Sequence, residues 1–112
     1  MAKKFTELEV NSILNDFLNK VQEHISIDRA ILFGSYAKGK ADLYSDMDLM
    51  VVSRDLPQNK TKGMNACYIF DLIGYESVPT DLELIAIHPE KLKNPITKDF
   101  YAEIFATGRV IR

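Results

Sequence analysis

Two short segments decide the fold of this chain: Leu-Phe-Gly-Ser-Tyr-Ala-Lys-Gly at residues 32–39 and Ser-Asp-Met-Asp-Leu-Met-Val-Val at residues 45–52. Each segment contains an apolar run that is typical of a strand in a sheet covered on both faces. The first run ends in a Gly-Ser pair, and the second begins with two aspartates. The pattern therefore predicts two strands whose connection carries a tight turn at one end and carboxylates at the other.

The Gly-Ser pair predicts a place where an anion can approach the backbone. Gly34 allows close approach, and the Ser35 hydroxyl and the amides that follow can donate hydrogen bonds to a phosphate. Alone, such a pair would indicate only a turn. The acids that follow it favour a phosphate site.

Asp46 and Asp48 are predicted to point to the same side, because side chains alternate along a strand. They would lie about 7 Å apart, a spacing at which they can jointly hold divalent cations. Magnesium prefers oxygen ligands and usually binds through one or two carboxylates together with substrate phosphates. A phosphate-binding turn beside two such ligands predicts a site for a nucleoside triphosphate.

The order Gly-Ser, ten residues, Asp-x-Asp resembles the signature of the DNA polymerase beta-like nucleotidyltransferases. The chain is most similar to the minimal nucleotidyltransferases, small single domains often paired with HEPN-domain proteins in toxin–antitoxin systems. The resemblance runs from about residue 30 to residue 84. It implies a polymerase beta-like fold, ATP as substrate and two magnesium ions bound by Asp46, Asp48 and a third acid.

The resemblance places that third acid on a neighbouring strand, where Asp81 matches it. Asp81 would bind the catalytic metal and accept a proton from the attacking hydroxyl. Glu83 shares its face, so a shift of register would exchange the two residues. Lys38 stands where the family usually has an arginine, and it could contact phosphate as a point charge but not as a bidentate fork.

Hydrophobic periodicity predicts one α/β (α+β) domain over residues 1–112, with a small mixed sheet flanked by helices. A capping box at Thr6 and Glu9 begins the first helix. Apolar spacing places Leu8, Met64, Tyr68, Ile96, Phe100 and Phe105 on buried helix faces, and Tyr36 and Tyr44 are expected to be half-buried. The expected helices are 5–25, 64–75 and 95–106, with helical turns at 36–40 and 89–92; the expected strands are 30–33, 46–53, 81–87 and 110–111.

Composition restricts the classes of function. A formal charge of −2 argues against a broad basic surface for direct nucleic-acid binding. The single cysteine excludes an internal disulfide and favours the cytoplasm. No segment approaches the ~20 apolar residues of a membrane span.

The leading hypothesis is a magnesium-dependent enzyme that transfers AMP from ATP to a hydroxyl of a partner protein. The resemblance implies that this partner is a HEPN toxin and that the chain acts as its antitoxin. The sequence leaves open whether the chain forms a homo- or hetero-oligomer. One alternative is a non-catalytic antitoxin that neutralises the partner by binding. Another is a nucleotidyltransferase for a small molecule such as an aminoglycoside.

Overall fold

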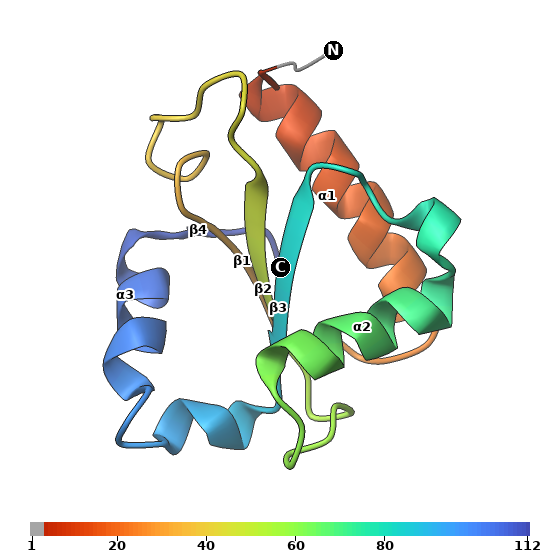
Figure 1. Cartoon of the computed structure of the whole chain (residues 1–112), viewed down its shortest axis with the longest axis vertical. Coiled ribbons are helices and arrows are strands. Elements are labelled where there is room, and N and C mark those ends of the chain that lie inside the picture. The colour runs from red at the N-terminus through yellow and green to blue at the C-terminus, as the bar shows by residue number, and fades with distance from the viewer. Residues whose placement is uncertain (1–3) are drawn as a thin grey trace.

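Residues 4–112, which the computed structural model describes, form three α-helices, four strands and two short 3-10 helices (Figure 1). The elements are α1 (Glu7–Gln22), β1 (Arg29–Phe33), β2 (Met47–Val52), α2 (Lys62–Ile73), η1 (Tyr75–Ser77), β3 (Leu82–Ile87), η2 (Pro89–Lys93), α3 (Lys98–Thr107) and β4 (Arg109–Val110). This alternation of helices and strands confirms the predicted α/β architecture.

The four strands form one mixed sheet in the order β3-β2-β1-β4. β1 is antiparallel to both β2 and β4, whereas β2 and β3 run parallel. A parallel pair needs a crossover connection, and α2 supplies it. The start of β2 therefore lies between the end of β1 and the start of β3. The chain segments that leave β1, enter β2 and enter β3 meet at this end of the sheet.

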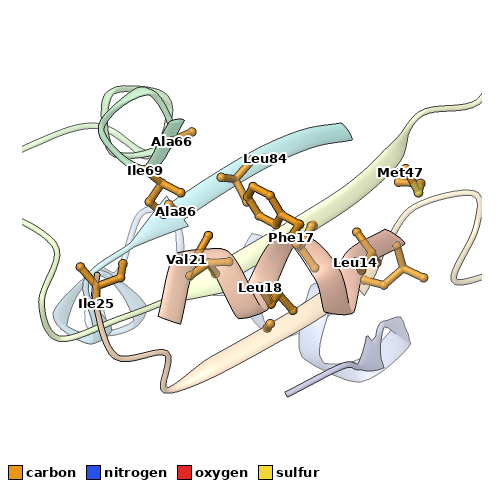
Figure 2. Close-up of a cluster of buried hydrophobic side chains, with 14 of the residues drawn as sticks. Leu14, Phe17, Leu18, Val21, Ile25, Met47, Ala66, Ile69, Leu84 and Ala86 are labelled. Carbon is orange, nitrogen blue, oxygen red and sulfur yellow. The ribbon is translucent and has the colours of Figure 1, made fainter. Parts of the chain in front are cut away.

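Helices cover both faces of the sheet, as the apolar runs of β1 and β2 predicted (Figure 1). α1 and α2 pack on one face, where Phe17, Met47 and Leu84 belong to the larger hydrophobic cluster (Figure 2). Tyr101 and Ile104 of α3 pack on the other face against Met50, Val52 and Ile87. Within residues 4–112, no helix is both long enough and apolar enough to cross a bilayer.

The first helix begins at the predicted capping box. Glu9 N–H donates to Thr6 Oγ1 at 3.1 Å, and Thr6 N–H donates to Glu9 Oε1 at 2.9 Å. The helix ends at Gln22, before the predicted residue 25, although Ile25 is still buried. The prediction for Leu8 was wrong: its side chain is 82% exposed, because the stripe that meets the sheet starts at Val10.

Several apolar side chains of α2 and α3 are exposed, contrary to the prediction. In α2 the buried positions are Asn65, Ala66 and Ile69, so Met64 and Tyr68 turn toward solvent. α3 begins only at Lys98 and contacts the sheet through a narrow stripe of two residues, Tyr101 and Ile104. The exposed side chains outside this stripe are Ile96, Phe100 and Phe105.

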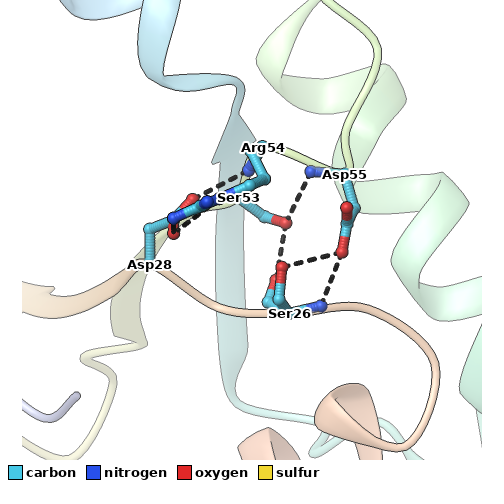
Figure 3. Close-up of polar contacts among 5 residues, drawn as sticks. All are labelled: Ser26, Asp28, Ser53, Arg54 and Asp55. Atoms are coloured by element: carbon cyan, nitrogen blue, oxygen red, sulfur yellow. Dashed lines mark hydrogen bonds and ion pairs between the residues drawn. The ribbon is translucent and has the colours of Figure 1, made fainter.

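A polar cluster joins the two loops at the far end of β2 (Figure 3). The buried Ser53 hydroxyl donates to the Ser26 carbonyl at 2.6 Å, and Ser26 N–H donates to Asp55 Oδ2 at 2.7 Å. Arg54 donates to Asp28 from its backbone and from its guanidinium. These bonds fix the entry to β1 against the exit from β2, at the end opposite Asp48.

Candidate active site

The turn after β1 lies directly against the first acid of β2. Gly34 has φ of +72°, a conformation that glycine adopts without strain. A Cβ atom added at Gly34 would overlap the carboxylate of Asp48. Phe33 and Asp48 are cross-strand partners in β1 and β2, so the antiparallel register itself brings the glycine and the acid together.

The helical turn predicted at 36–40 is present as a turn at residues 35–39. Lys38 N–H donates to the Gly34 carbonyl at 3.1 Å, and Lys40 N–H donates to the Ser35 carbonyl at 2.9 Å. These bonds close the chain back on itself immediately after Gly34. Ser35 is half-buried in this turn, and Lys38 is exposed.

Asp48 is the most perturbed carboxyl of this region. Burial raises the pKa of Asp48 to about 6, and a hydrogen bond with Glu83 and the negative charges of Glu83 and Asp46 act in the same direction. Asp46 lies just before β2 and is exposed. The three carboxyl groups therefore create a negative potential at the start of β2 and β3.

The parallel register places Glu83, and not Asp81, level with Asp48. Asp81 lies just before β3, and its backbone carbonyl accepts a hydrogen bond from Met47 N–H at 2.8 Å. Glu83 follows it by two residues on the strand, and its side chain interacts with Asp48. The alternation of β3 predicted that Asp81 and Glu83 share a face, but the choice between them depends on the pairing of β2 with β3.

A hollow of about 180 Å³ adjoins the turn on the α3 side of the sheet. Gly34 and Lys38 line it together with Phe33, Phe100, Glu103, Ile104 and Thr107. Sites for whole small ligands usually enclose at least ~300 Å³, so this hollow can hold only part of a nucleotide. The contribution of α3 was not predicted, because the only sequence signal was the apolar character of Phe100.

A larger hollow of about 390 Å³ lies on the other side of the same turn, at the start of α1. Tyr36 and Arg109 line it, but none of the three carboxylates does. The size of a hollow therefore does not identify the site here. We place the candidate site at the acids and the Gly34 turn.

The donor set fits magnesium that binds together with a substrate. A divalent cation stabilises the charged form of a carboxyl whose pKa is raised by burial and by neighbouring acids, as that of Asp48 is. Within residues 4–112, no three Asp, Glu, His or Cys side chains are grouped closely enough to hold a metal ion by themselves. Substrate phosphate oxygens would then complete the coordination, as is usual for magnesium.

The two tyrosines of the connection differ. Tyr36 is half-buried as predicted: its hydroxyl accepts a hydrogen bond from Phe5 N–H at 3.1 Å, and its ring lies 6.5 Å from that of Phe5. The prediction for Tyr44 was wrong, because its side chain is 83% exposed. Within residues 4–112, no apolar element reaches across the connection at residue 44 to cover the ring.

The chain matches known families and folds through this region. The family described as "Nucleotidyltransferase domain" matches residues 14–108, which include the turn and all the acids discussed above. Two curated proteins of Methanocaldococcus jannaschii are similar. "Putative protein adenylyltransferase MJ1305" is 45% identical over 56 residues, or 48% of this chain and 38% of the relative. "Putative protein adenylyltransferase MJ0141" is 35% identical over 57 residues, or 49% of this chain and 58% of the relative.

Solved structures share the fold at low sequence identity. A "putative nucleotidyltransferase from Sulfolobus solfataricus" has a TM-score of 0.62 at 15% identity, covering 98% of this chain and 89% of that one. A "toxin-antitoxin with AMP-PNP" has a TM-score of 0.56 at 19% identity, covering 88% of this chain and 71% of that one. The family match covers most of the chain, and the turn and carboxylates lie inside it; the chain belongs to the nucleotidyltransferase domain family.

Proposed function

We propose that this chain transfers AMP from ATP to a hydroxyl group of a partner protein, with magnesium as cofactor. The observation that carries the proposal is the contact between the Gly34 turn and Asp48, with Glu83 beside them. On this proposal, groups that donate hydrogen bonds to phosphate and carboxylates that bind metal lie together at one end of the sheet. Two relatives are named as protein adenylyltransferases, and their similarity to this chain favours a protein acceptor and an adenylyl donor.

The turn would bind the triphosphate. Backbone amides after Gly34 and the Ser35 hydroxyl can donate hydrogen bonds to phosphate oxygens, and Lys38 supplies a positive charge at the edge of the adjoining hollow. Because the glycine has no side chain, the phosphates can approach the backbone closely. In this arrangement the turn orients the leaving pyrophosphate.

Asp46 and Asp48 would hold magnesium, and the third ligand is Glu83 or Asp81. We favour Glu83, since it interacts with Asp48 and Asp81 lies outside the strand. When bound, magnesium supplies positive charge that stabilises the triphosphate and the charge that develops in transfer. Its positive charge would also offset the burial and the neighbouring negative charges that raise the pKa of Asp48.

The chain's own residues would then position the reaction. The acceptor oxygen forms a bond to the α-phosphorus, and the bond from that phosphorus to the oxygen bridging to the β-phosphate breaks. Pyrophosphate leaves with the electron pair, and the hydroxyl proton passes to the third carboxylate, which acts as general base. Positioning and electrostatic stabilisation supply most of the rate enhancement in such displacements.

The partner is proposed to be a toxin, for which this chain is the antitoxin. The structural similarity to a toxin–antitoxin complex that contains AMP-PNP supports a partner and an adenine nucleotide. The resemblance to minimal nucleotidyltransferases favours a HEPN-domain protein. The segments aligned with the curated relatives span 38% and 58% of those proteins, so the activity of this chain must be measured directly.

The test is incubation with α-labelled ATP and magnesium, with and without the protein encoded beside this one, read by intact mass. We expect the partner to gain an adenylyl group, and Asp48→Asn to abolish the gain. Asp16→Asn, an exposed aspartate on α1, is the matched control and should retain full transfer.

Two results would contradict the proposal in different ways. Inhibition of the partner by Asp48→Asn without any transfer would favour an antitoxin that acts by binding alone. ATP binding without transfer to any protein would favour a small-molecule acceptor.

A further inference from the structure

Tyr44 is the most exposed tyrosine of the chain and lies two residues before Asp46. A network of short-range hydrogen bonds fixes the backbone around it. Tyr44 N–H donates to Asp42 Oδ1 at 2.9 Å, and Asp42 N–H donates to Ser45 Oγ at 2.9 Å. The Tyr44 ring is therefore presented to solvent from an ordered turn at the entrance to β2.

The other tyrosine hydroxyls are poorly placed to reach the carboxylates. Residues 4–112 include all five tyrosines of the chain. Tyr36 accepts a hydrogen bond from Phe5 beneath the turn, and Tyr101 is buried against the sheet. Tyr68 and Tyr75 belong to α2 and η1, on the side of the sheet opposite α3 (Figure 1).

We propose that the chain also adenylylates itself on Tyr44. The proposal rests on the proposed adenylyl transfer and names an acceptor within this chain. Two residues of extended chain span at most ~7 Å, so the Tyr44 backbone stays within about one side-chain length of Asp46, one of the proposed metal ligands. An exposed hydroxyl held this close to the acids has the access that an acceptor needs.

The chemistry is the same displacement with a different acceptor. Tyr44 Oη forms a bond to the α-phosphorus of ATP, the bond to the bridging oxygen breaks, and pyrophosphate leaves with the electron pair. The phenolic proton passes to a carboxylate of the site and then to water. The product is a phosphodiester on Tyr44 that places an adenosine over the entrance to β2.

Self-modification would have a consequence for function. A nucleotide attached at Tyr44 would cover the exposed Asp46 and obstruct entry of a second ATP. Modification would then limit the number of turnovers in the absence of a partner. This effect predicts a burst of labelling that ends near one adenylyl group per chain.

The experiment uses the whole chain with ATP and magnesium and no partner, followed by intact mass and peptide mapping. We expect one adenylyl group on Tyr44, its loss in Tyr44→Phe and in Asp48→Asn, and its persistence in Tyr75→Phe. Tyr75 is a matched control, since it is also exposed but lies away from the acids. A rate per molecule that is independent of protein concentration means transfer within a chain and supports the proposal. A rate that rises with concentration means transfer between copies and overturns it, since the proximity of Tyr44 to its own acids would then play no part.

Two further measurements on the same preparation distinguish failure of the Tyr44 proposal from failure of the proposed function. They are labelling of the partner and magnesium-dependent binding of AMP-PNP. Transfer to the partner without any label on Tyr44, or with label on another residue, overturns self-adenylylation and leaves the proposed function intact. Failure of AMP-PNP binding and of all transfer overturns the proposed function, and the Tyr44 proposal with it.

Discussion

Gly34 and Asp48 are in direct contact: a Cβ atom at residue 34 would occupy the position of the Asp48 carboxylate. The two residues come from opposite ends of the connection between β1 and β2, and the cross-strand pair of Phe33 with Asp48 brings them together. The turn proposed to bind phosphate and the acid proposed to bind metal therefore pack as one unit.

Gly34→Ala should abolish nucleotide transfer and destabilise the fold. The left-handed conformation of residue 34 costs a non-glycine residue about 1–2 kcal/mol, and the displaced Asp48 side chain adds to this cost. Gly39→Ala is the matched control, because Gly39 has φ of +69° but no atom within 4 Å of its added Cβ. We expect urea unfolding to show the strain in both variants and the transfer assay to show loss only in Gly34→Ala. Equal activities would contradict the proposed role of this contact.

Glu83→Gln should reduce transfer much more than Asp81→Asn. Glu83 is level with Asp48 and interacts with it, whereas Asp81 precedes the strand. Removing a metal ligand or its close partner typically reduces metal affinity or activity about 10–100-fold. Magnesium titration of the transfer rate would show the loss as a raised requirement for the cation. A larger defect in Asp81→Asn would instead assign the third ligand to Asp81.

Lys38→Met should weaken binding of ATP by roughly tenfold, which corresponds to the loss of one charge-assisted contact of about 1.4 kcal/mol. Lys38 is exposed and lines the hollow beside Gly34, so its removal should leave the free energy of unfolding unchanged. Lys38→Arg retains the charge and is the control. Calorimetric titration with AMP-PNP and magnesium measures the difference, and equal affinities of the wild type and Lys38→Met would exclude a phosphate contact.

Asp48→Asn should stabilise the metal-free protein near neutral pH. Burial, the hydrogen bond with Glu83, and the charges of Glu83 and Asp46 raise the pKa of Asp48 from 3.8 to about 6. The stabilisation from this group is therefore fully present below pH 3.8 and is lost as the pH rises through 6. The shift corresponds to at most ~3 kcal/mol, and solvent screening of the half-buried side chain reduces this to about 1 kcal/mol.

The measurement is urea unfolding of wild type and Asp48→Asn between about pH 4 and pH 7.5, without divalent cations. Asp48→Asn should have a larger free energy of unfolding than the wild type near pH 7.5. The two free energies should converge as the pH falls toward about 4. Two carboxyls at the opposite end of β2 have lowered pKa values: a hydrogen bond from Arg54 lowers that of Asp28, and one from Ser26 lowers that of Asp55. Protonation of these two carboxyls at low pH destabilises both proteins equally. Its effect therefore cancels in the difference between their free energies of unfolding. Parallel curves across this range would contradict the prediction.

Ser53→Ala should reduce stability without reducing transfer. The buried Ser53 hydroxyl donates to the Ser26 carbonyl and accepts from Asp55 N–H at 3.1 Å, so its loss should cost about 1–2 kcal/mol. Ser53 is five residues from Asp48, or roughly 16 Å along β2. Arg54→Ala, which breaks an exposed ion pair, should cost less than the loss of the buried Ser53 hydroxyl. Loss of specific activity in folded Ser53→Ala would contradict this separation of stability and chemistry.

Much of the site could be predicted because its parts lie close together in the sequence. Side-chain alternation along one strand predicts Asp46 and Asp48 on the same side, and in the structure the charge of Asp46 contributes to the raised pKa of Asp48 after burial and Glu83. The choice between Asp81 and Glu83 could not be made in this way. It depends on the parallel register of β2 with β3, which is fixed by where the α2 crossover returns the chain to the sheet.

The helix faces show a second limit of periodicity. Ile96, Phe100 and Phe105 are apolar and were expected to be buried, but α3 contacts the sheet only through Tyr101 and Ile104. Periodicity identifies which residues share a helix face, whereas the width of the covered stripe depends on how much sheet lies beneath it. The exposure of Tyr44 likewise depends on tertiary packing. It follows from the fact that no element within residues 4–112 packs over the connection between β1 and β2 at this residue.

The mixed sheet has a consequence for how the site assembles during folding. The Gly34 turn and Asp48 belong to one antiparallel hairpin, whose closure requires ordering the connection at residues 34–46. Glu83 lies 35 residues after Asp48 and reaches it only when the parallel pair forms, a contact with a larger loop-closure entropy. A chain that has formed only the hairpin carries the turn proposed to bind phosphate and the acids Asp46 and Asp48, without Glu83. The three acids therefore come together only when β2 and β3 pair. The proposed transfer activity accordingly requires the whole domain to be folded.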